Sequence, residues 1–164
     1  MSQSATRAAD PHTIYQRMQE AVMRKEDATL LPAELLAEDV VVETPFSPPG
    51  MRRIEGRDAW LEFYRNRALP VHFDRFRELS THRTDDPEVI VVEYELTGTI
   101  TNTDQPASAT FIGILRVRDG LIKHWREYQD ILAISEALKL APEDVSGPDA
   151  HSTSEQSTSA PTSP

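Results

Sequence analysis

An Asp-Gly pair between two long β-type segments constrains the fold of this chain more than any other feature. Residues 108–118 and 121–129 are rich in apolar and β-branched side chains, and only Asp119-Gly120 separates them. Such a pair favours a tight hairpin, because both residues tolerate the positive φ angles that a two-residue turn requires. Residues 71–80 and 89–101 have the same character. The sequence therefore predicts four long antiparallel strands in succession.

Helical patterns precede these strands. Asp10-Pro11 offers an N-cap residue and a first-turn proline, and the apolar spacing that follows predicts a helix over residues 11–25. Asp27 can cap a short second helix, and a third is expected over residues 56–68. The apolar side of the second helix would consist of Leu30, Leu31, Leu35 and Leu36.

A strand and a closing helix complete the predicted elements. Residues 40–44 are β-branched and end at Pro45, after which residues 47–50 must be irregular. Residues 130–140 return to helical spacing. Three helices, a run of antiparallel strands and a short helix indicate an α+β fold, with helices packed on one face of a strongly bent sheet.

Composition divides the 164 residues into one domain and two flexible ends. Residues 1–9 are polar, and residues 141–164 consist almost entirely of Ser, Thr, Pro, Ala and acidic residues. Such a segment buries too little apolar surface to offset its chain entropy. We therefore expect a folded domain over residues 10–140 and a disordered acidic tail.

The charge and the residue types exclude several classes of function. A net charge of −10 disfavours nucleic acid and anionic membranes as partners, and the absence of cysteine removes disulfides and thiolate nucleophiles. The histidines lack metal-ligand spacing, and no glycine-rich nucleotide motif occurs, so neither a metal nor a cofactor is expected. Without a secretory signal or an apolar run of about 20 residues, the sequence predicts a cytoplasmic protein.

Three motifs in order resemble the SnoaL-like branch of the nuclear transport factor 2-like superfamily. They are Glu-Asp-Val-Val-Val-Glu-Thr-Pro-Phe at residues 38–46, Gly-Arg-Asp at 56–58 and Arg-Asp-Gly-Leu-Ile-Lys-His-Trp at 118–125. The resemblance implies a cone-shaped half-barrel with three N-terminal helices around a small-molecule pocket, and a homodimer formed through the convex sheet face. The superfamily includes isomerases, polyketide cyclases, epoxide hydrolases, dehydratases and non-catalytic proteins, so the resemblance leaves the reaction open.

Two branches of the superfamily can be compared with individual residues. Ketosteroid isomerases place an Asp base just before the proline of the first strand and a protonated Asp on a later strand; here Thr44 and Gly113 stand at those positions. Chemistry through those groups is therefore not expected. Residues 126–130 resemble the phenazine-biosynthesis A/B proteins, which implies that Glu127 is the catalytic acid, although Phe63 replaces their histidine.

The last strand offers two alternative pocket faces. Alternation places Lys123, Trp125 and Glu127 on one face and His124, Arg126 and Tyr128 on the other. The resemblance favours the face with Glu127. A carboxyl enclosed by aromatic side chains would have a raised pKa suited to proton transfer. The expected aromatic wall consists of Phe46, Trp60, Phe63, Tyr64 and Trp125. In the alternative reading, Glu127 forms a solvated pair with Lys123, Arg116 or Arg118.

Further candidates could complete the site. Glu93 and Glu95 share one face of a strand and could share a proton with Glu127, or they could pair with arginines on a solvated surface. Tyr94, on the opposite face from both, is expected in the core or an interface. His124 could act as a base. Arg52, beside the expected pocket mouth, could attract an anionic substrate.

The predicted function is a cofactor-independent tailoring enzyme of secondary metabolism. It would be a cyclase, isomerase or dehydratase that acts on a hydrophobic, carbonyl-bearing small molecule by general acid/base catalysis through Glu127. The alternative is a non-catalytic protein that binds a small molecule or serves as an interaction module. A buried carboxyl with a shifted pKa in a closed cavity would favour the enzyme.

Overall fold

The computed structural model describes residues 9–24, 30–47, 49–65 and 69–139. Residues 1–8 of the expected flexible start, the acidic tail and the first residues of the expected second helix lie outside these ranges. No helix in the described ranges has the length and apolar character needed to cross a membrane.

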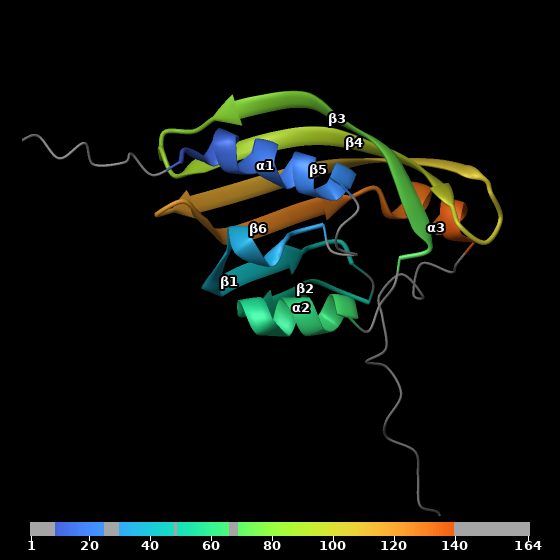
Figure 1. The fold of residues 1–164 in the computed structure, drawn as a ribbon, viewed down its shortest axis with the longest axis horizontal. Helices are drawn as coiled ribbons and strands as arrows, with labels where there is room; N and C mark the ends of the chain where they lie inside the picture. The colour runs from blue at the N-terminus through green and yellow to red at the C-terminus, as the bar shows by residue number, and fades with distance from the viewer. Residues whose placement is uncertain (1–8, 25–29, 48, 66–68, 140–164) are drawn as a thin grey trace, which may run out of the picture.

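Six strands form one curved sheet in the order β2-β1-β6-β5-β4-β3 (Figure 1). Strands β3 to β6 form the predicted antiparallel meander, and β1 and β2 extend the sheet beyond β6. The strands are β1 (Leu36–Thr44), β2 (Arg52–Glu55), β3 (Val71–Arg83), β4 (Val89–Ile100), β5 (Pro106–Arg118) and β6 (Leu121–Gln129). With three α-helices, this sheet confirms the predicted α+β class.

The Asp119-Gly120 hairpin forms as the sequence predicts. Asp119 has φ 53° and Gly120 has φ 76°, so both adopt the left-handed conformation that a tight hairpin turn requires. Arg118 pairs with Leu121 on either side of the turn. This local geometry sets the register of β5 against β6 at the end nearest the turn.

The N-terminal half differs from the expectations at two places. The described part of the second predicted helix contains only a 3₁₀ turn, Ala33–Leu35, and Leu36 already belongs to β1. Pro32 lacks an N–H group and precedes this turn, and Leu36 pairs with Ile122 of β6. Residues 47, 49 and 50 are irregular as expected, but the sequence did not predict β2 (Arg52–Glu55), which pairs with β1 at the sheet edge.

The expected antiparallel sheet also contains one parallel pair. β1 runs parallel to β6, although all the other neighbouring strands are antiparallel. A hairpin cannot make such a pair, but the long intervening chain of helix and strands can serve as its crossover connection.

The three helices pack against one face of the sheet, hereafter the inner face (Figure 1). They are α1 (Pro11–Arg24), α2 (Arg57–Arg65) and α3 (Ile131–Leu138). Asp10 caps α1, because its carboxylate accepts from the amides of His12 at 3.1 Å and Thr13 at 3.3 Å. Asp130 caps α3 by accepting from the Ala133 amide at 3.0 Å. α1 packs on β3, β4 and β5, α2 on β1 and β2, and α3 on β5.

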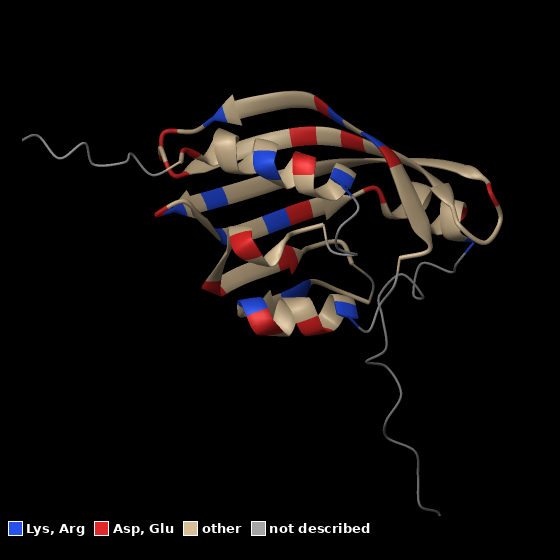
Figure 2. Ribbon diagram, in the orientation of Figure 1, with Lys and Arg blue, Asp and Glu red and all other residues tan. Residues whose placement is uncertain are grey.

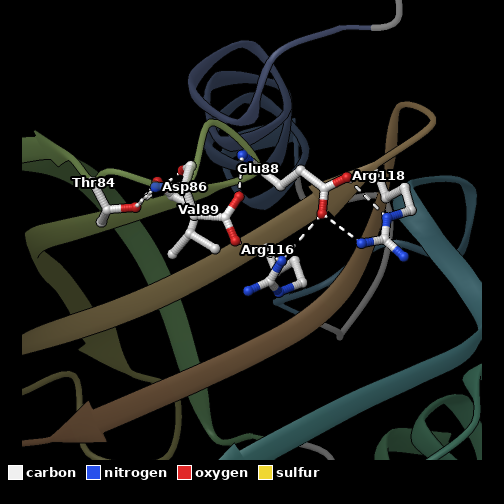
Figure 3. Close-up of polar contacts among 6 residues, drawn as sticks. All are labelled: Thr84, Asp86, Glu88, Val89, Arg116 and Arg118. Carbon is white, nitrogen blue, oxygen red and sulfur yellow. Dashed lines mark hydrogen bonds and ion pairs between the residues drawn. The ribbon is translucent and has the colours of Figure 1, made fainter.

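Acidic and basic residues are interspersed over the strands and helices (Figure 2). One group of them ties the turn between β3 and β4 to β5 (Figure 3). Glu88 accepts from Arg118 at 2.8 Å and from Arg116 at 3.1 Å, and Arg116 also pairs with Asp86 at 2.9 Å. Both arginines, which the sequence offered as partners for Glu127, therefore join this turn instead.

Gly113 provides a test of core packing. A methyl group added there would lie 2.3 Å from Cη2 of Trp125, closer than atoms can approach. We expect Gly113→Ala to lower the free energy of unfolding by about 1–3 kcal/mol, the usual cost of overpacking a core. Urea unfolding of the wild type and the variant would measure this change in the free energy of unfolding. Gly50→Ala is the control, because nothing lies within 4 Å of its added methyl. Equal stability of the two variants would contradict this packing.

Candidate functional site

Two adjoining cavities lie between the inner face of the sheet and the helices. The polar cavity, about 30 Å³, contains the side chains of Thr44 and Glu127 in its wall. The apolar cavity, about 140 Å³, is lined chiefly by aliphatic and aromatic side chains of β3, β4, β5 and α3. Both cavities are lined by Leu30, Arg52, Phe63, Tyr64 and Gln129. These shared residues make the two cavities neighbouring parts of one site.

Glu127 is the buried carboxyl of the polar cavity. It lies on β6 with only 4 % of its surface exposed, and both of its carboxylate oxygens accept hydrogen bonds. Tyr94 on β4 donates its hydroxyl to Oε1. Gln129 donates its side-chain amide to Oε2 at 2.6 Å. The carboxyl is therefore held in one orientation by donors from two different strands.

Burial raises the pKa of Glu127, because a charged carboxylate loses its water when it is enclosed. Hydrogen bonds from Tyr94, Gln129 and Trp125 act in the opposite direction, since they stabilise the anion. Burial, and then the nearby charge of Glu127, raises the pKa of Tyr94 well above its ordinary value. Tyr94 thus stays a proton donor in the hydrogen bond, and Glu127 is the member of the pair that can change its protonation state.

Aromatic side chains from α2 and β6 form the wall around this carboxyl. Trp60 and Tyr64 pack with their ring centroids 4.5 Å apart, and Phe63 lies 5.3 Å from Tyr64. The guanidinium of Arg52 lies over the Phe63 ring, 5.1 Å from its centroid. Trp125 completes the wall. All five expected binding residues named here line the polar cavity.

A bulge in β6 decides which side chains reach this wall. His124 pairs with Arg116 and Ile122 pairs with Val117, so Lys123 is an extra residue between them. The alternation that placed Lys123 beside Trp125 and Glu127 is therefore wrong. Lys123 instead pairs with Asp39 at 2.7 Å.

Three expected catalytic residues lie on the opposite, outer face of the sheet. Glu95 pairs with Arg77 at 3.0 Å, and Glu93 accepts from the Ser80 hydroxyl at 3.3 Å. His124 lies 2.8 Å from the buried carboxyl of Glu43. Strict alternation in β4 sends Tyr94 inward and both glutamates outward, so the expectation that they lie beside Glu127 is corrected.

Phe46 also lies away from the cavity. It is 65 % exposed and packs edge-on against Tyr128, with the ring centroids 5.2 Å apart. Phe46 follows the end of β1, where the chain turns before β2. Its expected place in the aromatic wall is therefore corrected to the outer side of the sheet.

The sequence reasoning missed Tyr94 and Gln129 as members of the site. Gln129 could have been found, because it lies two residues after Glu127 on the same strand face. Tyr94 was correctly expected in the core, but its contact with Glu127 depends on the register of three strands. Among the described residues, no three His, Cys, Asp or Glu side chains come together in a way that could hold a metal ion.

A curved, unclosed sheet with helices around a pocket defines the nuclear transport factor 2-like, ketosteroid isomerase-like class of protein. A family model described as the SnoaL-like domain matches residues 15–125. This match covers most of the chain. The protein therefore belongs to the SnoaL-like domain family.

Two relatives and one solved structure show how close the likeness is. The uncharacterized protein YesE of Bacillus subtilis is 30 % identical over 106 residues, 64 % of this chain and 72 % of YesE. An uncharacterized PhzA/B-like protein of Pseudomonas aeruginosa is 32 % identical over 108 residues, 64 % of this chain and 74 % of that protein. A proposed isomerase of Bacillus subtilis has a crystal structure that aligns with a TM-score of 0.69 at 25 % identity, over 78 % of this chain and 91 % of that one.

Other solved structures share the fold but differ in chemistry. At TM-scores of 0.57 to 0.59 they include a Δ5-3-ketosteroid isomerase from Mycobacterium, an epoxide hydrolase of M. tuberculosis and a proposed polyketide cyclase from Xanthomonas campestris. One fold thus holds several reactions among these proteins.

The raised pKa of Glu127 predicts a pH-dependent stability. A carboxyl whose folded pKa is raised stabilises the fold fully below its unfolded pKa, and this contribution is lost as the pH rises through the folded pKa. The unperturbed value is 4.5. We therefore expect the wild type to lose stability relative to Glu127→Gln as the pH rises from about 4 to about 8, measured by urea unfolding of both proteins. A constant difference over this range would contradict the raised pKa.

Proposed function

We propose that this protein is a cofactor-independent enzyme that moves a proton within a hydrophobic, carbonyl-bearing small molecule, as a cyclase, isomerase or dehydratase does. The observation that carries the proposal is a buried carboxyl with a raised pKa in the wall of the polar cavity, next to the apolar cavity. A raised pKa lets a carboxyl hold a proton at a pH nearer to neutrality than a solvated glutamate does, and the group can also release that proton. Solvated glutamates stay ionised there and cannot act as general acids.

The surroundings of Glu127 support both halves of a proton transfer. The carboxylate would remove a proton from the carbon next to the carbonyl, and the resulting acid would return it to another carbon or to a leaving oxygen. The hydroxyl of Tyr94 and the amide of Gln129 would stabilise the anionic form during the cycle. The aromatic wall would exclude water from the intermediate. Each step leaves the numbers of protons and electrons unchanged.

The likeness to a PhzA/B-like protein supports a role in the biosynthesis of small molecules. The isomerase, cyclase and epoxide hydrolase structures of the same fold support a tailoring reaction in that setting. On this proposal the protein works in the cytoplasm on a freely diffusing substrate.

Deuterium exchange of ketones tests the proton-transfer step without knowledge of the natural substrate. Cyclohexanone and cyclohex-2-enone, incubated with the protein in deuterated water, would exchange the protons next to the carbonyl, followed by NMR. We expect Glu127→Gln to lower this rate about 10²- to 10⁴-fold, the usual contribution of a positioned acid or base.

Glu62→Gln is the matched control for this experiment, because Glu62 is an exposed carboxyl on α2. The Glu62→Gln variant should promote deuterium exchange of the ketones at the wild-type rate. If Glu127→Gln also kept that rate, Glu127 would have no part in the chemistry. Binding of the ketones with no exchange in the wild type would favour a non-catalytic binding protein instead.

We also propose that the protein forms a homodimer through the outer face of the sheet. Ile112 in the middle of β5 is 44 % exposed there, and its neighbour across the strand pair is Tyr128, against which Phe46 packs. Exposed apolar side chains at one place on a sheet are typical of an interface.

Sedimentation velocity tests the homodimer. Ile112→Glu would place a charge in the buried interface, so we expect it to shift the protein from dimer toward monomer at micromolar concentration. Glu62→Gln should sediment as the wild type. A monomeric wild type would contradict the proposal.

A further inference from the structure

Thr44 carries a buried hydroxyl that has no hydrogen-bond partner among the described residues. Thr44 is the last residue of β1, and it lines the polar cavity together with Glu127. Buried hydroxyl groups are nearly always hydrogen-bonded, because a buried polar group without a partner destabilises the fold. The oxygen therefore lacks a partner at the place where a ligand would meet Glu127.

The surroundings of Thr44 restrict what this partner can be. Val42, Ile54, Trp60 and Trp125 line the same cavity and offer hydrocarbon surface. A cavity of about 30 Å³ has room for about two waters, since each needs roughly 10–15 Å³ by the same kind of measure. The partner is thus one small oxygen-bearing group, such as a carbonyl or a hydroxyl, and not a phosphate or a chain of polar atoms.

The apolar cavity sets the size of the rest of the ligand. It measures about 140 Å³, and an apolar protein cavity of about 150 Å³ is known to hold one benzene molecule. Its wall includes Phe73, Leu96, Phe111, Ile134 and Leu138. A single six-membered ring fits this space, whereas a fused two-ring compound exceeds a volume of this size.

We propose that Thr44 determines specificity by hydrogen-bonding the oxygen of a single-ring ketone or alcohol whose ring fills the apolar cavity. Arg52, Phe63, Tyr64 and Gln129 border both cavities, so the ring and its oxygen occupy neighbouring parts of one site. The oxygen then lies in the polar cavity, whose wall includes Glu127. The inference deepens the proposed function, because it assigns the substrate class of the same pocket.

A pair of probes of equal shape tests the hydrogen bond. Cyclohexanone and methylenecyclohexane differ only in an oxygen that replaces a CH₂ group. The two tryptophans of the chain, Trp60 and Trp125, both line the polar cavity, so their indole N–H signals in NMR titrations report binding. Thr44→Val keeps the shape of the side chain and removes the hydroxyl.

We expect Thr44→Val to weaken cyclohexanone binding about 2- to 10-fold, the net contribution of one hydrogen bond, and to leave methylenecyclohexane binding unchanged. Thr110→Val is the matched control, because Thr110 belongs to the outer-face set of β5 residues, and it should bind both probes as the wild type does. Circular dichroism and urea unfolding would show that both variants fold.

Three results would overturn the inference. They are an unchanged cyclohexanone affinity in Thr44→Val, an equal loss for both probes, and no saturable binding of cyclohexanone by the wild type. Tight binding of the two-ring ketone 1-decalone would overturn the size limit. These titrations measure binding alone, so they can contradict the role of Thr44 even if deuterium exchange depends on Glu127. In the same way, the exchange experiment can contradict the role of Glu127 even if Thr44 is found to bind the ketone oxygen.

Discussion

The buried hydrogen bonds of Glu127 are the constraint on which the rest of this structure depends. An enclosed carboxylate without partners would cost several kcal/mol, so the fold must give it donors or keep it protonated. Tyr94 and Gln129 supply the donors, and they come from strands on either side of β5. Between them Gly113 leaves room for the ring of Trp125. A side chain at Gly113 would displace this ring and disturb the packing around the carboxyl.

The two faces of the sheet give their ionisable side chains different electrostatic environments. The inner face holds Tyr94 and Glu127 among aromatic rings, where low polarity strengthens each electrostatic interaction and burial raises the pKa of Glu127. The outer face carries ion pairs such as Arg77 with Glu95, which are partly solvated and contribute little energy each. Glutamates of similar appearance in the sequence therefore have different chemistry, because strand alternation decides which of them lose their water.

Membership of the SnoaL-like family explains the fold but does not define the reaction, which depends on the side chains of the site. Where the resemblance to ketosteroid isomerases places two aspartates, this chain has Thr44 and Gly113. Here Thr44 offers a hydroxyl to the polar cavity, and Gly113 accommodates a tryptophan ring. The same backbone positions thus carry a cavity hydroxyl and a packing glycine in this protein, and the carboxyl of the polar cavity comes from β6.

The sequence by itself determined the features that depend on neighbouring residues. The Asp119-Gly120 turn, the long strands, the first helix and the shared face of Trp125 and Glu127 follow from local φ preferences and from periodicity. Only the tertiary structure decided the parallel pairing of β1 with β6, the bulge that removes Lys123 from the inner face, and the contact between Tyr94 and Glu127. The bulge lies within the β5–β6 hairpin, but the other two features depend on the register between segments far apart in the chain. That register is set by how the whole core packs, and no single stretch of sequence encodes it.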